Sequence, residues 1–499
     1  MRNLGYILLL MLLMSNLSSC FNDKGNYDYI EIQEAVIKAI PGVTDNGNRL
    51  VCLENEQIKL KPELEFKAGS TAEDYEFIWF RFPKKPQGTS GHYEQADTLA
   101  MTQNLDYKIV NSPRDYWVVY KVIHKKTHAL SEQKFEFIIS AVNGWIVLDE
   151  DGNGHGDLQI IRDKDIVSGG DGRVINNYYS QNNGGNKIHN GRFIAYCNYL
   201  TNMYIYSEQG AYILDASTYI ERPDKSYADL FSSVVSLDVI NPQAEYYDRS
   251  GGNTEVLVND YKIYKVSYRM MGQTQFTEAT GVGEYKAAPS IAPIRVAGSS
   301  NCAVLFDMLN NRFLTIGTWG NLAAPASASG VFNIGAVNPE WEYIYLGEGK
   351  DGETCLVMKD DTGIRYLLRA NLVSKEPVAV ACVNLEKLPD IKESAYYAFG
   401  IRGEFMFYAT HSKVYTWRFG KETASDFLSV ADGEEIVGMK LYNNPDDNSM
   451  NGKILFIATR KEGKGKIYKV LFNEMNGMPL AAPKVYSGFG IIKDMFYKS

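Results

Sequence analysis

The chain has 499 residues, of which 45% are hydrophobic and 22% are charged, and its formal net charge is −9 at pH 7. This is the composition of an ordinary globular protein, and the length allows two or three domains. The basic residues adjoin only in pairs, such as Lys84-Lys85 and Lys125-Lys126. An acidic chain without a basic patch lacks what holds a phosphate backbone, which excludes nucleic acid as a partner.

The first 19 residues have the layout of a secretory signal peptide. Arg2 supplies a positive charge, and the apolar run from Leu4 to Met14 is shorter than the roughly 20 residues that a membrane-spanning helix needs. The run is followed by Leu17-Ser18-Ser19-Cys20, which matches the small-small-Cys site of bacterial lipoprotein processing. We predict a signal peptide over 1–19, lipidation of Cys20 and a tether over 20–29, because several acyl chains on one residue anchor a protein stably. The alternative is a plain secretory signal with a chance cysteine.

The other five cysteines show no pairing pattern. They are Cys52, Cys197, Cys302, Cys355 and Cys382, at wide spacing and without a CxxC motif. Each lies in or beside an apolar stretch, so we predict small buried side chains, with no disulfide framework and no metal site.

Residues 30–142 carry short strand-like segments separated by Gly, Pro and Asn. Tyr75–Phe80 and Phe135–Ile139 are apolar at every second position, as half-buried strands are. Tyr116–Ile123 is more continuously apolar, which predicts a strand buried on both faces. With a Trp in mid-strand, this segment predicts an all-β domain, an immunoglobulin-like sandwich without the disulfide.

Residues 143–499 repeat one pattern seven times: an apolar strand, a short polar turn and a second strand. The second strands begin at residues 157, 211, 262, 312, 365, 413 and 466, at intervals of 48 to 54 residues. The pentapeptide Lys-Ile-Tyr-Lys-Val recurs unchanged at 262–266 and 466–470. Strands and tight turns at a period near 50 are typical of propeller blades, so we predict a seven-bladed β-propeller.

The C-terminal segment predicts how the ring closes. Later hairpins follow an extra strand, such as Glu435–Leu441 before the seventh, whereas the first hairpin has none of its own. Gly490–Tyr497 is a strand with no hairpin after it. We expect it to complete the first blade, which removes an open sheet edge.

These features together resemble the PKD-like family of lipoproteins found with outer-membrane nutrient importers of the SusC/SusD type. The resemblance spans essentially the whole chain and depends on Cys20–Tyr29, Gly144–Leu148, Phe407–Ala409 with Lys413–Tyr415, and Gly488–Lys498. It implies a PKD-like module and a propeller on an accessory lipoprotein that captures oligosaccharides or peptides for import. It further implies an outer-membrane location, on the cell surface or the periplasmic face, with no catalytic residues and no cofactor to transfer.

Motifs for metal binding or catalysis are weak. Asp149–Asp157 begins like a calcium loop, but the twelfth position, where a bidentate Glu belongs, is Ile160, which favours a plain hairpin. The six histidines form no HExxH motif, and there is no GxSxG elbow. We therefore expect a protein that is not an enzyme. A propeller hydrolase or lyase with a carboxylate pair over the channel stays open as an alternative, as does a module that only holds importer subunits together.

Aromatic residues in three expected loops are the candidate ligand-binding residues. They are Tyr178 and Tyr179 in 168–192, Tyr246 and Tyr247 in 241–253, and Trp319 in 317–320. Flat rings beside amides suit sugar rings or peptide backbones. The alternative is that these rings pack beneath their own loops.

Overall fold

The computed structural model describes residues 35–43, 48–53, 56–84, 96–109, 114–140, 142–167, 170–249, 252–326, 329–444, 446–447 and 449–498. The expected signal peptide, Cys20 and the tether lie outside these residues. The chain divides into two compact units, 1–140 and 141–499. The helices in the described ranges are all too short or too polar to cross a membrane.

The first unit is a β-sandwich. One layer is a five-stranded sheet of β2 (Arg49–Leu53), β9 (Leu130–Ser140), β8 (Arg114–His124), β5 (Tyr75–Pro83) and β6 (Asp97–Ala100), in that order. Two short sheets pair β1 (Val36–Ala39) with β4 (Glu63–Glu65), and β3 (Gln57–Leu60) with β7 (Leu105–Lys108). Side chains from β3 and β7 pack against the large sheet and close the core.

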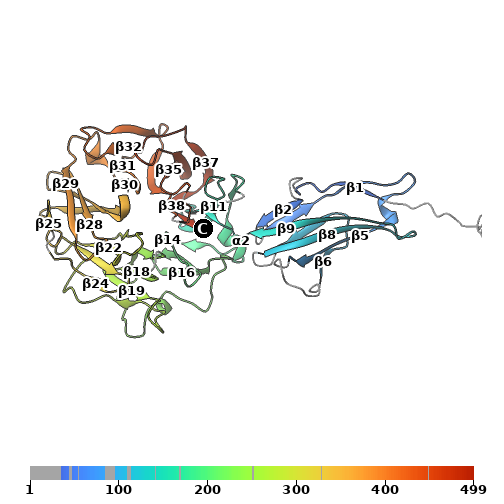
Figure 1. Cartoon of the computed structure of the whole chain (residues 1–499), viewed down its shortest axis with the longest axis horizontal. Coiled ribbons are helices and arrows are strands. Elements are labelled where there is room, and N and C mark those ends of the chain that lie inside the picture. Colours follow the sequence, from blue (N-terminus) through green and yellow to red (C-terminus); the bar gives the residue numbers. More distant parts are fainter. Residues whose placement is uncertain are drawn as a thin grey trace, which may run out of the picture. The chain divides into compact units, whose positions relative to one another are not determined.

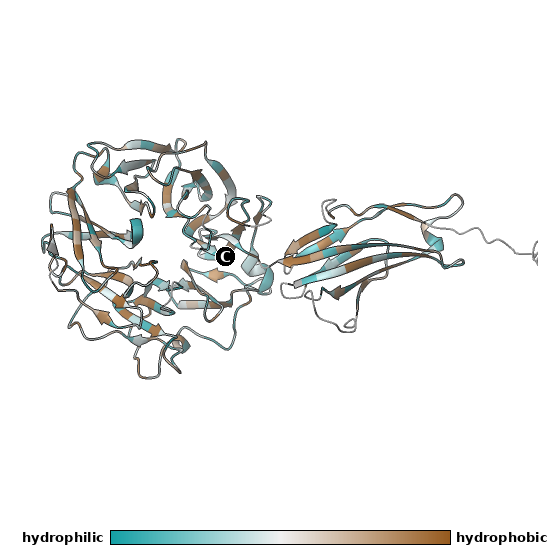
Figure 2. Cartoon of the chain, in the orientation of Figure 1, coloured by the Kyte–Doolittle hydropathy of each residue, from teal (hydrophilic) through white to brown (hydrophobic). Residues whose placement is uncertain are grey.

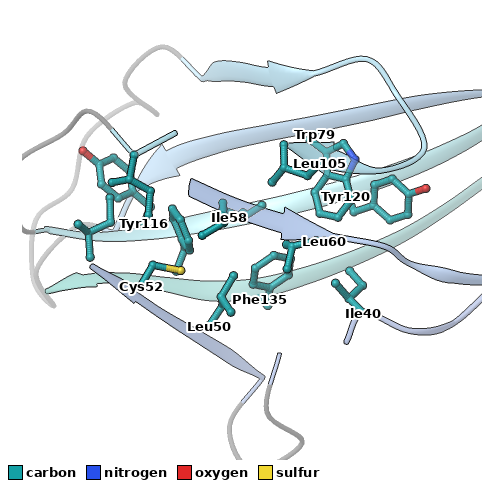
Figure 3. Close-up of a cluster of buried hydrophobic side chains, with 14 of the residues drawn as sticks. Ile40, Leu50, Cys52, Ile58, Leu60, Trp79, Leu105, Tyr116, Tyr120 and Phe135 are labelled. Atoms are coloured by element: carbon teal, nitrogen blue, oxygen red, sulfur yellow. The ribbon is translucent and has the colours of Figure 1, made fainter. Parts of the chain in front are cut away.

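Aromatic rings form the centre of this core (Figure 3). Trp79 is fully buried, and its ring stacks on Tyr120 with the centroids 4.1 Å apart. The prediction that β8 is buried on both faces was wrong, because Trp117 and Lys121 on its outer face are only half-buried. The aliphatic stem of a lysine can cover apolar surface while its ammonium stays in water, which explains this mixed outer face. Figure 2 shows the alternation of polar and apolar residues along the strands.

The second unit consists of seven sheets arranged in a ring (Figure 1). From the innermost strand outward, blade 1 has β38 (Ile491–Lys498), β10 (Gly144–Glu150), β11 (His155–Ile161) and β12 (Val174–Ile175), with β13 (Ile188–His189) also on β11. Blade 2 has β14 (Gly191–Cys197), β15 (Asn202–Ser207) and β16 (Gly210–Asp215). Blade 3 has β17 (Pro242–Tyr247), β18 (Thr254–Asn259), β19 (Lys262–Ser267) and β20 (Thr277–Glu278). Blade 4 has β21 (Ala292–Pro293), β22 (Asn301–Asp307), β23 (Arg312–Gly317) and β24 (Leu322–Ala323).

The remaining three blades follow the same plan. Blade 5 has β26 (Glu342–Glu348), β27 (Thr354–Lys359), β28 (Arg365–Asn371), β29 (Val378–Asn384) and β25 (Ser329–Gly330). Blade 6 has β30 (Tyr396–Phe399), β31 (Phe405–Ala409), β32 (Lys413–Arg418) and β33 (Ser425–Ser429). Blade 7 has β34 (Glu435–Leu441), β35 (Ile454–Lys461), β36 (Lys464–Leu471) and β37 (Lys484–Phe489). The all-β class, the sandwich and the seven-bladed propeller are confirmed.

The C-terminal strand closes the ring as predicted. β38 pairs antiparallel with β10, so that Trp145 lies opposite Tyr497 and Val147 opposite Met495. The Asp494 carboxylate of β38 pairs with Lys440 of blade 7 at 2.6 Å and accepts a hydrogen bond from the Ile194 amide of blade 2 at 2.9 Å. The last strand therefore holds both neighbouring blades.

A buried ion pair lies at the seam between blades 7 and 1, where the last blade meets the first. The Asp163 carboxylate, which follows β11, contacts the ammonium groups of Lys469 and Lys484 and accepts a hydrogen bond from the Tyr486 hydroxyl. Burial alone would raise the pKa of Asp163, but these partners hold it well below its usual range. Blade 7 thus supplies the positive charge that blade 1 needs.

The structure differs from the sequence-based expectations in three further places. The expected loop 241–253 contains β17, and 168–192 contains β12, a short helix α2 (Tyr178–Asn182) and β13. Four of the five described cysteines are buried as predicted, but Cys382 is exposed because it lies on the outer strand β29.

Candidate ligand-binding site

The innermost strands of all seven blades surround a cavity of about 660 Å³. It occupies the end of the central channel at which these strands terminate, and we call this end the mouth. The mouth is marked by residues at or just beyond the strand ends: Asn198, Arg249, Arg295, Glu348, Ile401, Asn443 and Tyr497. A concave site of this size, lined by aromatic side chains and a few polar groups, is typical of small-ligand binding.

Arg295 and Glu348 form the main charged pair in the cavity wall. They belong to adjacent blades 4 and 5, and their guanidinium and carboxylate are in direct contact. The Asn443 amide donates a second hydrogen bond to Glu348 at 2.8 Å, and the guanidinium carbon lies 5.4 Å from the ring centre of Tyr246. Burial raises the pKa of the Glu348 carboxyl even with Arg295 beside it. The group offers donors, acceptors and a ring within one wall.

A second ion pair crosses the mouth. Arg249 of blade 3 and Asp446 of blade 7 are 2.6 Å apart, although blades 1 and 2 separate their blades around the ring. Asn443 likewise reaches from blade 7 to Glu348 of blade 5. The segment after β34 therefore extends over part of the opening.

Acidic and basic side chains line the cavity in equal numbers. Its acidic residues are Glu245, Glu348 and Asp446, and its basic residues are Arg249, Arg295 and Lys440. Each basic side chain is paired with a carboxylate, because Lys440 contacts Asp494 in the same way as Arg295 contacts Glu348 and Arg249 contacts Asp446. The site therefore offers both hydrogen-bond donors and acceptors.

Glu245 differs from the other two acids because its neighbour is a second carboxyl, that of Glu255. Tyr206 of blade 2 donates a hydrogen bond to Glu245, and Tyr268 donates one to Glu255. Burial raises the pKa of both glutamates, and the nearby Glu255 carboxyl raises that of Glu245 further. Two close buried carboxyls cannot both ionise cheaply, so the pair retains a proton where an exposed glutamate would be ionised.

The five predicted aromatic residues fall into three different settings. Tyr178 and Tyr179 lie in α2 and are buried, with Tyr179 donating to Glu221 at 2.9 Å and Tyr178 packing edge-to-face on Tyr219. Both rings thus pack against the segment that follows β16 (Gly210–Asp215) and not beneath their own loop. The structure does not place them at the cavity.

Tyr246 and Tyr247 line the cavity, from the innermost strand β17 and not from a loop. Trp319 lies in the turn after β23 and is 57% exposed, with the Arg269 guanidinium 5.4 Å from its ring centre. The charged residues Arg295 and Glu348 carried no sequence signal, because neither lies in a motif and their spacing along the chain is set by the blade repeat.

The first carboxylates of the calcium-like loop are engaged by hydrogen bonds within the protein. Asp149 accepts hydrogen bonds from Gln159 and from the amide of Gly490, between β37 and β38, and Asp151 accepts from the amides of Asn153 and His155. Within the described residues, no group of three or more His, Cys, Asp or Glu side chains is placed to hold a metal ion.

Comparison with known proteins finds a family match in the N-terminal part of the chain. A model of the PKD-like family matches residues 20–190. The match covers the sandwich and continues into the first blade of the propeller. No curated protein matches the chain.

Solved structures of low sequence identity share the fold to a limited extent. A quinonprotein alcohol dehydrogenase-like protein from Bacteroides thetaiotaomicron is 12% identical with a TM-score of 0.41, over 94% of this chain and 100% of that one. The extracellular domain of a putative hybrid two-component system from the same organism is 12% identical with a TM-score of 0.38, over 75% of this chain and 55% of that one. The WD40 domain of SCAP from fission yeast is 10% identical with a TM-score of 0.34, over 59% and 73%. At these values no activity transfers to this chain.

Proposed function

We propose that this protein is a non-catalytic lipoprotein of the bacterial outer membrane that captures an oligosaccharide or a peptide for a SusC/SusD-type nutrient importer. The observation that carries the proposal is the cavity at the mouth of the channel, with its aromatic walls and its equal numbers of acidic and basic side chains. The PKD-like match over 20–190 and the lipoprotein-like N-terminus support the cell-envelope setting.

A binding role accounts for the state of the cavity carboxyls. Glu348 is engaged by Arg295 and Asn443, Asp446 is engaged by Arg249, and Glu245 holds hydrogen bonds within the wall. A general acid or base needs a proton-transfer path to the substrate, whereas carboxylates fixed in ion pairs serve better as preorganised hydrogen-bond acceptors.

Titration calorimetry on the mature protein tests ligand capture directly. Neutral oligosaccharides and peptide digests are the two probe classes, and one of them should bind in the micromolar range or tighter. Arg295→Met should weaken that binding at least about tenfold, because a charge-assisted hydrogen bond contributes about 1.5–3 kcal/mol. The exposed Lys464→Met serves as the control and should leave the affinity unchanged. Equal affinities of wild type and Arg295→Met would remove the cavity from the proposal.

Replacement of Cys20 by Ala tests the anchor. The variant should move the folded protein from the membrane fraction to the soluble fraction, because the acyl chains are lost. Membrane association that survives the substitution would place the anchor elsewhere.

Co-purification of an importer with the lipidated protein tests the partner. If no importer co-purifies from cells grown on the captured nutrient, the accessory role is contradicted.

One observation favours a second candidate function. Glu245 and Glu348 both line the cavity, and burial raises the pKa of each, as glycosidase acids require. Incubation with the same probes should release no product in the binding role. Turnover that disappears in Glu348→Gln would establish the enzyme instead.

A further inference from the structure

Two exposed aromatic rings lie outside the cavity, beside its mouth. Tyr199 is 52% exposed and Trp319 is 57% exposed, whereas most large aromatic residues of the propeller are buried. Tyrosine and tryptophan rings are enriched at recognition surfaces, where one part of the ring is apolar and the other can hydrogen-bond.

The strand register places Tyr199 and Trp319 at the same end of the propeller as the mouth. Tyr199 follows the end of β14. In blade 3, Ser267 at the end of β19 pairs with Thr254 at the start of β18, and β18 begins where β17 ends. In blade 4, Gly317 at the end of β23 pairs in the same way with Asn301 at the start of β22. The turns after β14, β19 and β23 therefore lie on the face at which the innermost strands end.

Contacts within these turns connect the exposed rings to the cavity wall. Tyr199 stacks on Tyr268 with centroids 4.5 Å apart and planes inclined by 18°. Tyr268 in turn lies 6.3 Å from the ring of Tyr247, which lines the cavity, and its amide donates to the Asn253 carbonyl at 2.9 Å. A row of rings thus leads from the cavity to Tyr199.

Trp319 is connected through the neighbouring turn. Arg269, the residue after Tyr268, holds its guanidinium 5.4 Å from the ring centre of Trp319. The Thr254 hydroxyl donates to the Thr318 carbonyl at 3.1 Å. We call Tyr199, Tyr268, Arg269 and Trp319 together the rim. The partners of Tyr199 and Trp319 each cover one ring face, fix the ring, and leave it more than half exposed.

We propose that the rim is a second binding region, at which a neutral oligosaccharide held in the cavity extends outward and stacks sugar rings on Tyr199 and Trp319. This inference rests on the proposed ligand capture in the cavity. A flat ring fixed from behind suits the apolar face of a pyranose, and Arg269 beside it donates to hydroxyl groups. Each basic side chain of the cavity is already paired with a carboxylate, which favours a ligand without net charge.

The exposed Met271 distinguishes this proposal from a protein-docking surface. Met271 is fully exposed in the turn that follows Arg269, and an apolar protein partner would use it together with Trp319. A sugar that stacks on Trp319 does not need it. Met271→Ala is therefore the matched control for the aromatic substitutions.

The test measures binding of neutral disaccharides and hexasaccharides of glucose, mannose and xylose to the full mature chain. The hexasaccharide of the preferred sugar should bind more tightly than its disaccharide. Tyr199→Ala and Trp319→Ala should each weaken hexasaccharide binding about five- to tenfold and leave disaccharide binding unchanged. Tyr199→Phe keeps the ring and should retain the affinity, as should Met271→Ala.

The remaining outcomes separate this inference from the proposed function. A hexasaccharide affinity that both alanine variants retain would overturn the rim while leaving the cavity as the binding site. A loss in Met271→Ala equal to that in Trp319→Ala would indicate an apolar docking surface and overturn the sugar platform. Binding of peptides or acidic oligogalacturonides in preference to every neutral oligosaccharide would also overturn it. Failure of all oligosaccharides and all peptides to bind would reject the proposed function itself.

Discussion

Two seams between blades bury carboxyl groups in different ways. At the seam of blades 7 and 1, Asp163 is surrounded by Lys469, Lys484 and the Tyr486 hydroxyl. At the seam of blades 2 and 3, Glu245 and Glu255 lie together and receive tyrosine hydroxyls, and within the described residues neither forms an ion pair. The first seam stabilises an ionised carboxylate, whereas the second stabilises a protonated carboxyl group.

The difference follows from what each seam has to accomplish. Asp163 and Lys469 are 306 residues apart in the chain, and their contact joins the first blade to the last. Bringing distant segments together costs loop entropy, and a buried ion pair admits few alternative partners. Blades 2 and 3 follow each other directly, so their seam forms without a matched charge.

The largest effect is expected from deleting residues 490–499, which removes β38 and reopens the first seam. The deletion exposes the inner edge of β10 and the apolar cluster around Trp145, so the propeller should lose most of its unfolding cooperativity. Urea unfolding followed by tryptophan fluorescence measures this. Removal of Ser499 alone is the control, and a truncated protein that melts like the full chain would contradict closure by β38.

Lys469→Met should have the next largest effect, because it leaves the buried Asp163 without its closest cation. Breaking a buried pair from one side costs about 3–5 kcal/mol of unfolding free energy, and adding Asp163→Asn should recover part of it. Lys464→Met, on the exposed part of the same strand, is the control for urea unfolding.

The pH dependence of the first seam has a defined sign. Because the folded pKa of Asp163 lies below its unfolded value, its stabilisation is present at neutral pH and is lost as the pH falls below about 4. The single Lys469→Met variant should therefore show a weaker loss of stability on acidification. An unchanged acid transition would contradict the role of the pair.

The second seam should respond to pH in the opposite direction. The pKa values of Glu245 and Glu255 are raised in the folded state, so their contribution is full below about pH 4.5 and is lost as the pH rises through the folded values. Glu255→Gln removes one titrating group and should flatten this loss between pH 5 and pH 8. Thermal melts at several pH values measure it. Glu278→Gln, on an exposed position of the same blade, should keep the wild-type slope.

The smallest effect is expected from the exposed pair across the mouth. Asp446 is 63% exposed in its side chain, and surface ion pairs contribute about 0–1 kcal/mol. Asp446→Asn should change the unfolding free energy by less than about 0.5 kcal/mol in urea titrations. A cost as large as that of Lys469→Met would mean that burial does not set the difference in stabilisation between these two ion pairs.

The sequence by itself determined the architecture. Strand alternation and turns are local properties, and their repetition at 48 to 54 residues predicts seven blades and a C-terminal strand that completes the first. The aromatic core of the sandwich follows in the same way from Tyr75–Phe80 and Phe135–Ile139.

Only the tertiary structure decided the site. β17 begins at Pro242 and carries the polar Gln243 and Glu245, which accept hydrogen bonds from the Tyr261 amide and the Tyr206 hydroxyl, so this short segment was expected as a loop. Arg295, Glu348 and Asn443 meet because three blades converge on one axis, and no spacing in the chain encodes that convergence. Exposure is also a tertiary property, and it separates the buried Tyr178 and Tyr179 from the exposed Trp319, although all three are aromatic residues in Gly- and Asn-rich segments.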